Sequence, residues 1–230
     1  MTVDSQIVSR LLKIQDTIRT LELKYQRPEN SVELLAVSKT KPTQDILSAA
    51  KCGQTHFGEN YAQEGVAKIQ TLAAQNFCWH FIGPLQKNKT RIIAEHFHWV
   101  HTIERATIAE RLDAQRSASL PPLQVCIQVN IDKEDSKSGL ELSQVQELAE
   151  KINHLKQIKL RGLMAIPQAS SDTMQQRKSF AKLREQLEIL NKNGFNLDTL
   201  SMGMSGDLEA AIAEGATIVR VGTAIFGSRE

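Results

Sequence analysis

Short apolar runs alternate with helical patterns along this chain, and that alternation constrains its fold more than any other feature. Eight runs have the length and composition of buried strands, at residues 32–38, 55–58, 78–82, 99–103, 124–130, 160–166, 199–202 and 218–221. Helical patterns separate them, at residues 44–51, 61–74, 89–96, 106–117, 143–155, 174–191 and 208–214. Strands that alternate with helices form parallel sheets, because each parallel connection needs a long crossover. We therefore expect an α/β fold, a parallel sheet closed into a (β/α)8 TIM barrel.

One more helix precedes the first strand. Its apolar residues recur at alternating spacings of four and three, at Ile7, Leu11, Ile14, Ile18 and Leu21. This is the stripe of an amphipathic helix, which we expect to end before Pro28. One barrel uses about this much sequence, so residues 1–230 are expected to form a single domain. An open doubly wound sheet is the alternative, disfavoured because no Gly-x-Gly-x-x-Gly pattern follows an early strand.

Three helix ends carry capping signals. Ser143 and Gln146 have the spacing of a capping box. Gly194 follows a helical pattern and is expected to stop that helix. Ser205 is expected to cap the helix that opens at Leu208 with its hydroxyl.

The composition fits a folded protein of the cytoplasm. With 41% apolar and 23% charged residues the chain can bury a sizeable core. Its net charge of +2 gives no electrostatic reason to bind nucleic acid. Cys52, Cys78 and Cys126 are odd in number and widely spaced, which argues against a disulfide framework or a zinc site and fits a reducing cytosol. The N-terminus has no unbroken apolar stretch, so we expect neither a signal peptide nor a membrane span.

Two turns rich in small residues predict a phosphate site near the end of the chain. They follow the last two expected strands and contain Ser205, Gly206, Gly222 and Thr223. In a barrel such turns lie together at the carboxyl ends of the strands, where phosphorylated ligands bind. Their N–H groups and hydroxyls can hold a phosphate. Asp207 and Glu209 would repel a dianion, so both side chains are expected to point away from it.

Lys39 follows the first expected strand directly and is the candidate covalent anchor for that ligand. Desolvation at the barrel rim, beside a cation such as Arg220, would lower the pKa of a lysine and favour the free amine that forms a Schiff base. An amine together with a phosphate clamp is what pyridoxal phosphate requires. A solvated loop lysine is the alternative, and Lys41 and Lys137 are the next amines to consider. Arg220 lies in an apolar strand, so it must face outward or meet an anionic or acceptor partner in the barrel.

Other polar residues carry weaker signals. His80 and Asn60 can line a ligand ring, although each is equally compatible with a rim residue bonded to backbone. His96, His98 and His101 are close in sequence, but strand alternation places His101 on the opposite face from the other two. We therefore expect no metal site.

Seven segments of the chain strongly resemble, in order, the pyridoxal phosphate homeostasis proteins of the YggS/PROSC family. They are residues 34–42, 57–61, 79–86, 136–139, 161–167, 200–205 and 220–227. The likeness extends from about Ile7 to Gly227. It implies a single barrel like the N-terminal domain of alanine racemase, and a role in vitamin B6, amino acid and keto acid balance.

The resemblance also implies functional residues. Pyridoxal 5'-phosphate (PLP) would be held as a Schiff base by Lys39, with Arg220 near the pyridine nitrogen or phosphate and Asn60 near the ring substituents. The phosphate grip would comprise Ser205, Gly206, Gly222 and Thr223. The implied partners are PLP and apo-enzymes that accept it.

We expect no enzymatic turnover and therefore no catalytic residues. A racemase takes a second acid or base from a tyrosine of an added domain, whereas this chain ends after the barrel and has only Tyr25 and Tyr61. A PLP-dependent racemase of low activity is the first alternative. An aldolase-like barrel, in which Lys39 attacks a sugar phosphate, is the second. A monomer is expected, because no exposed apolar heptad or spare strand edge is evident.

Overall fold

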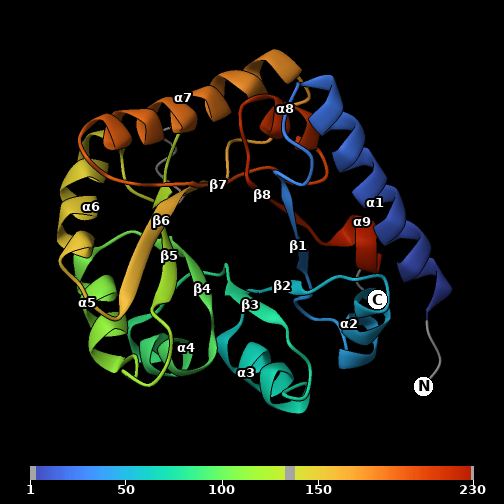
Figure 1. The fold of residues 1–230 in the computed structure, drawn as a ribbon, viewed down its shortest axis with the longest axis horizontal. Helices are drawn as coiled ribbons and strands as arrows, with labels where there is room; N and C mark the ends of the chain where they lie inside the picture. Colours follow the sequence, from blue (N-terminus) through green and yellow to red (C-terminus); the bar gives the residue numbers. More distant parts are fainter. Residues whose placement is uncertain (1–3, 133–137, 229–230) are drawn as a thin grey trace.

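Eight parallel strands close into a barrel in the order of the sequence (Figure 1). The computed structural model describes residues 4–132 and 138–228. The strands are β1 (Glu33–Val37), β2 (His56–Glu59), β3 (Cys78–Phe81), β4 (Trp99–Ile103), β5 (Leu123–Val129), β6 (Ile158–Ala165), β7 (Thr199–Ser201) and β8 (Ile218–Val221). The barrel closes where β8 pairs with β1, from Glu33 opposite Ile218 to Ala36 opposite Val221.

Helices form a ring around these strands (Figure 1). They are α1 (Ser5–Lys24), α2 (Thr43–Ala50), α3 (Ala62–Thr71), α4 (Thr90–His96), α5 (Ala106–Gln115), α6 (Val145–Asn153), α7 (Thr173–Lys192), α8 (Leu208–Ala213) and α9 (Thr223–Phe226), with 3-10 turns at η1 (Lys87–Lys89) and η2 (Leu142–Gln144). The predicted (β/α)8 barrel with an extra N-terminal helix is confirmed, and the open sheet is wrong.

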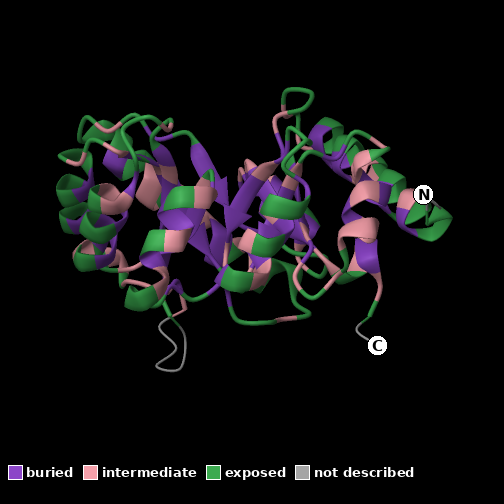
Figure 2. Ribbon diagram, turned by 90° about the horizontal axis from the view of Figure 1, so that it is seen from below, coloured by how far each residue is buried: buried purple, intermediate pink, exposed green. Residues whose placement is uncertain are grey.

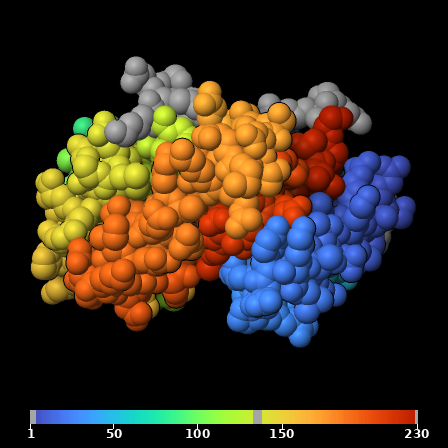
Figure 3. Space-filling model, turned by 90° about the horizontal axis from the view of Figure 1, so that it is seen from above, coloured from blue at the N-terminus to red at the C-terminus, as the bar shows by residue number. Residues whose placement is uncertain are grey.

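The N-terminal helix covers the seam of the barrel. The predicted stripe of α1 has Ile7, Leu11, Ile18 and Leu21 buried, and Asp4 caps the helix by accepting from the N–H groups of Gln6 and Ile7. The last helix, α9, has only four residues, so it cannot cover the pair β8 and β1 by itself. Helix α1 packs against α9, α8 and α2 and fills that place in the ring. Figure 3 shows α1 in blue and α7 in orange on either side of the red C-terminal segments.

Two capping predictions are wrong and one is confirmed. The chain enters α6 through the 3-10 turn η2, so Gln144 is the N-cap residue and Ser143 forms no capping box. Helix α8 begins at Leu208 as predicted, but its N-cap is Asp207 rather than Ser205, because the chain makes one more turn over residues 205–207. Gly194 ends α7 as predicted, with a positive φ of 93° that suits glycine.

Buried residues fill the inner faces of the helices and the strands, as Figure 2 shows in purple. Polar residues are also buried inside the barrel, among them His80, His101, Ser201 and Arg220. Buried polar groups need hydrogen-bond partners, and these four find them in one another and in the backbone. Among the described residues, no helix is long and apolar enough to cross a membrane.

Candidate functional site

Lys39 lies at the carboxyl end of β1, where the strand turns toward α2. Its side chain is half-buried, and its amine has no hydrogen bond or ion pair within residues 4–132 and 138–228. A small cavity of about 60 Å³ is lined by Lys39 together with Val37, Thr40, Gly222 and Thr223, among others. The structure therefore places the candidate anchor beside the second of the two predicted phosphate turns.

The candidate residues follow consecutive strands of the barrel. Ser205 and Gly206 come after β7, Gly222 and Thr223 after β8, Lys39 after β1, and Asn60 after β2. The N–H of Arg220 donates to the carbonyl of Gly203 at 2.9 Å and so ties the turn after β7 to β8. Since neighbouring parallel strands end at the same edge, these side chains share one sector of the barrel mouth.

The two phosphate turns differ in how tightly they are packed. Ser205 and Gly206 are exposed, their N–H groups are unpaired within the described chain, and a Cβ placed on Gly206 would meet nothing within 4 Å. A Cβ on Gly222 would lie 3.2 Å from the carbonyl oxygen of Val37 and 3.3 Å from its Cβ. Glycine at 222 thus lets the turn after β8 approach β1, and with it Lys39.

The two acidic residues near the first turn are both turned to other partners. Glu209 accepts from the Lys24 amine at 2.6 Å and from the Tyr25 hydroxyl at 2.8 Å, so it points toward α1 as predicted. Asp207 accepts from the N–H of Met204 within its own turn. Burial raises the pKa of the Asp207 carboxyl, an effect opposed by that backbone N–H and by the positive charge of Arg220.

A buried polar network holds both neighbours of Lys39. The Lys68 amine donates to Glu59 at 2.8 Å, to Glu64 at 2.6 Å and to the carbonyl of Ser38 at 2.7 Å. The Ser38 hydroxyl donates to the same Glu59 oxygen at 2.6 Å, and the N–H of Thr40 donates to Glu64.

Thr40 itself has a positive φ of 64°, unusual for a β-branched residue. Such strain persists only where surrounding contacts enforce it. The network therefore fixes the backbone on both sides of Lys39, and none of its described residues pairs with the Lys39 amine.

Arg220 faces the inside of the barrel and meets acceptors there, which confirms one of the two predicted alternatives. Its guanidinium donates to the Ser201 hydroxyl and to the carbonyl of Ala165, both at 2.9 Å. Burial lowers the pKa of Arg220 to about 10, while the charge of Asp207 opposes that shift. Arg220 therefore carries a buried positive charge within the barrel.

A chain of imidazoles extends from Ser201 across the barrel. The Ser201 hydroxyl contacts Nδ1 of His101 at 2.7 Å, Nε2 of His101 contacts Nδ1 of His80 at 2.9 Å, and Nε2 of His80 contacts Nδ1 of His56 at 3.0 Å. Burial lowers the pKa of His101 to about 3 and that of His80 well below its usual value. Both buried rings are therefore neutral, and each has one nitrogen that donates and one that accepts.

Asn60 provides an unpaired acceptor at the mouth. Its Oδ1 is buried without a hydrogen-bond partner in the part of the chain that the structure describes, and so is Oε2 of the neighbouring Glu59. The loop after β3 packs so closely on Asn60 that a Cβ on Gly83 would overlap the Asn60 carbonyl. A buried acceptor without a donor is costly unless a ligand or water supplies one.

The other predicted candidates lie elsewhere. His96 bonds to the Ile92 carbonyl, His98 accepts from the Trp79 N–H, and His101 is inside the barrel, so these three histidines form no metal cluster. Lys41 donates to the Ser228 carbonyl at 3.0 Å, and Lys137 lies outside the described residues.

Neither tyrosine is buried at the mouth. Tyr25 bonds to Glu209 at the end of α1. Tyr61 precedes α3 and is 52% exposed.

Sequence reasoning missed the network around Lys68 and the chain beyond Ser201. A partial signal was present, since Glu64 and Lys68 have the i,i+4 spacing of a helical ion pair. Likewise His56 and Cys78 begin two neighbouring strands, and His80 lies on the same face of its strand as Cys78. Nothing in the sequence shows that Lys68 meets Ser38, or that His80 is joined to Ser201 through His101.

Comparison with known proteins gives consistent matches. The sequence model of the alanine racemase N-terminal domain matches residues 10–230. A "pyridoxal phosphate homeostasis protein" of Vibrio alginolyticus is 53% identical, covering 98% of this chain and 99% of that protein. Among solved structures, PipY of Synechococcus elongatus with PLP bound is 37% identical with a TM-score of 0.83, covering 96% of this chain and all of that one. A protein from Bifidobacterium adolescentis is 33% identical with a TM-score of 0.91 and 98% coverage of both chains.

Proposed function

The chain belongs to the alanine racemase N-terminal domain family and, within it, to the pyridoxal phosphate homeostasis proteins, and from this we propose that it carries PLP bound covalently to Lys39. Its cofactor is PLP and its role lies in PLP homeostasis. The proposal extends to the site: Lys39 as anchor, Asn60 and Arg220 at the ring, and the two small-residue turns at the phosphate.

The residues present at the mouth fit this cofactor. PLP supplies an aldehyde, which condenses with a primary amine to a Schiff base with loss of water. Lys39 offers an amine without a competing partner in the described structure, and Asn60 Oδ1 offers a buried acceptor that lacks a donor. Ser205 and Gly206 offer unpaired N–H groups, and Thr223 adds a hydroxyl on the other side.

We expect Arg220 to supply charge to the cofactor rather than to transfer a proton. Its guanidinium lies inside the barrel and has hydrogen bonds to Ser201 and Ala165. An arginine stays protonated at neutral pH even when burial lowers its pKa to about 10. It therefore presents a fixed donor and a positive charge from below the mouth, which would hold the ring or phosphate without exchanging a proton.

We propose that the protein stores PLP and hands it to apo-enzymes in the cytoplasm, as a monomer and without amino acid turnover of its own. Relatives named as homeostasis proteins support the first part. The surroundings of the mouth support the second: neither Tyr25 nor Tyr61 is buried there, and Tyr61 is 52% exposed. Among the described residues the Tyr61 hydroxyl has no hydrogen bond that would hold it in place, so Tyr61 is poorly suited to be the second proton-transfer group that racemisation needs.

The observation that carries the proposal is the amine of Lys39, unpaired among the described residues, which lines one cavity with Gly222 and Thr223. The test is to load the purified protein with PLP, reduce it with borohydride and locate the pyridoxyl group by peptide mass spectrometry. We expect a visible absorption band before reduction and modification at Lys39. Modification at Lys41 or another lysine, at an equal level, would contradict the assignment of the anchor. A colourless protein that accepts a sugar phosphate at Lys39 would instead favour an aldolase-like reaction.

A further inference from the structure

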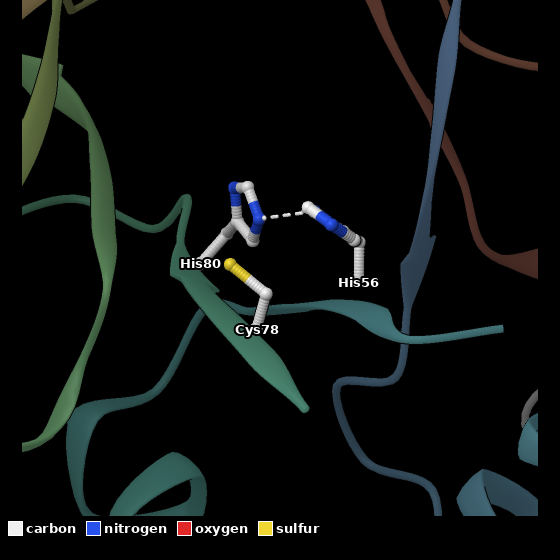
Figure 4. A group of neighbouring side chains, drawn as sticks. All are labelled: His56, Cys78 and His80. Carbon is white, nitrogen blue, oxygen red and sulfur yellow. Dashed lines mark hydrogen bonds between the residues drawn. The ribbon is translucent and has the colours of Figure 1, made fainter. Parts of the chain in front are cut away.

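A second cluster of chemically reactive side chains lies at the opposite end of the barrel from Lys39. His56 and Cys78 are the first residues of β2 and β3, and His80 follows two residues further along β3 (Figure 4). One nitrogen of each histidine and the sulfur of Cys78 lie within 4.8 Å of one another. We call these three residues the floor cluster, because the strands begin there and end at the mouth.

The register of the barrel produces this cluster. His56 pairs with Cys78 across β2 and β3, so their side chains start from neighbouring positions on the same level. His80 lies on the same face of β3 as Cys78, since side chains on a strand alternate. Figure 4 shows the two rings and the thiol turned toward a common point inside the barrel.

The spacing of the two rings is close to what a metal requires. His56 Nδ1 and His80 Nε2 are 3.0 Å apart. Two nitrogens bound to one tetrahedral zinc ion at about 2.0–2.1 Å would be separated by about 3.3 Å, so the rings need to open by only a few tenths of an ångström. A nitrogen and a thiolate on the same ion would be about 3.6 Å apart, which a rotation of the Cys78 side chain can supply.

The other nitrogen of His80 has a hydrogen-bond partner, and that of His56 has a carboxylate nearby. His80 Nδ1 lies 2.9 Å from Nε2 of His101, and its ring stacks on Trp99 with centroids 5.4 Å apart and an interplanar angle of 9°. His56 Nε2 lies 4.0 Å from a carboxylate oxygen of Glu33. Metal-binding histidines are commonly oriented by such outer contacts, which fix the ring and leave one nitrogen free for the metal.

We propose that the floor cluster of His56, Cys78 and His80 binds a zinc ion, with a water molecule in the fourth position. Two imidazoles and a thiolate are donors that favour zinc over magnesium or calcium. His56 has 29% of its side chain exposed, so the ion can enter from the floor without passing the PLP site. On binding, the Cys78 thiol gives its proton to solvent and its sulfur bonds to the metal; nothing is oxidised or reduced.

This site would communicate with the mouth through hydrogen bonds already present. When His80 Nε2 binds the metal, its proton must be on Nδ1, which then donates to His101 Nε2. His101 in turn donates from Nδ1 to Ser201, whose hydroxyl also accepts from Arg220. Zinc at the floor would therefore set the tautomers of both buried histidines below Arg220.

The test uses the PLP-loaded protein after dialysis against a chelator. Cobalt is added as a spectroscopic probe for zinc, and zinc affinity is measured by competition with a chromophoric chelator. We expect one equivalent of cobalt to give tetrahedral d–d bands and a thiolate-to-cobalt band in the difference spectrum. Zinc should also raise the thermal unfolding midpoint, because a ligand that binds only the folded state stabilises it.

Matched variants separate the floor cluster from other metal-binding groups, including PLP itself. C78S should lose the thiolate band, and both C78S and H56A should bind zinc more than about tenfold more weakly. C52S and H96A remove the same residue types elsewhere and should behave as the unmodified protein, and the thermal midpoint without metal shows that each variant folds. A thiolate band that persists in C78S, equal zinc affinity in C78S and C52S, or no zinc binding by the unmodified protein would overturn the proposal.

Discussion

Lys39 combines a backbone that is held on both sides with an amine that is unpaired among the described residues. Ser38 and Thr40, on either side, are held by Glu59, Glu64 and Lys68. Fixing the chain in this way lowers the entropy lost when the amine reacts, because the nucleophile is already positioned. Lys41, two residues further along the chain, is different because its amine donates to the Ser228 carbonyl.

Replacing Lys39 should therefore abolish covalent PLP binding without unfolding the protein. A half-buried rim lysine without partners in the described structure contributes little to stability, so the thermal midpoint of K39A should match that of the unmodified protein. The measurement is the amount of borohydride-stable pyridoxyl adduct per chain. K41A is the control and should keep its adduct, whereas an undiminished adduct in K39A would identify a different anchor.

Arg220 should matter more for PLP retention than Thr223. Hydrogen bonds to charged groups are worth about 1.5–3 kcal/mol and neutral ones about 0.5–1.5 kcal/mol. We expect R220A to weaken PLP binding by about tenfold or more and T223A by a few-fold, measured as dissociation constants on folded protein. R220A should also lower the thermal midpoint, because Ser201 and Ala165 lose a buried donor. Equal dissociation constants for the two variants would show that Arg220 does not act on the cofactor.

At the scale of elements, the strands could be predicted and several helix ends could not. Apolar runs such as residues 218–221 are distinctive because both faces of a barrel strand are covered. The start of α6 depends on whether the chain enters through a 3-10 turn, and the pattern of Ser143 and Gln146 does not reveal it. Ser205 is a residue type that caps helices well, yet Asp207 occupies the N-cap position of α8.

Predicting the strands also places the candidate residues at one edge of the barrel. It does not identify the buried residues that contact them. Lys39 and the turns at 205–206 and 222–223 follow strands directly, so strand prediction alone brings them to one edge. Lys68 meets Ser38 across 30 residues, and His101 meets Ser201 across 100. Such contacts depend on how α3 packs and on which strands are opposite in the closed barrel, and neither is a local property of the sequence.

The two phosphate turns should respond differently to added side chains. In G222A the new methyl group would press on Val37 at 3.2–3.3 Å, so the turn after β8 must move away from β1 and Lys39. We expect G222A to weaken PLP retention several-fold. In G206A the methyl group meets no protein atom within 4 Å, so the turn after β7 keeps its backbone and its N–H groups, and retention should fall less than in G222A. Equal retention in both variants would mean that the approach of β8 to β1 does not shape the site.

The contact between α3 and the β1–α2 turn should be among the most sensitive in the protein. K68M leaves Glu59, which is fully buried, without its counter-charge, and breaking a buried pair costs about 3–5 kcal/mol. We expect a large fall in the urea midpoint. The control is K151M, which breaks an i,i+4 pair that is exposed on both sides, and it should leave the midpoint unchanged. Similar midpoints for both variants would mean that Glu59 is not held as a carboxylate.

At the scale of the whole molecule, the barrel separates two sites that face opposite ends. PLP is proposed at the mouth, beside β7, β8, β1 and β2, and a zinc ion at the floor, where β2 and β3 begin. The buried chain of His80, His101, Ser201 and Arg220 joins them. A mouth that leaves Ser205, Gly206 and Thr223 exposed suits a cofactor that must leave as well as bind.

Transfer of PLP is the measurement that tests this function most directly. PLP-loaded protein is mixed with a PLP-dependent apo-enzyme, and the recovered activity is followed alongside assays for racemase, decarboxylase and transaminase turnover by the protein itself. We expect activity to return in proportion to the PLP supplied, with no sustained turnover of any amino acid by the carrier alone. Repeated turnovers by the carrier, or PLP that stays on Lys39 in the presence of excess apo-enzyme, would contradict a role in carrying PLP.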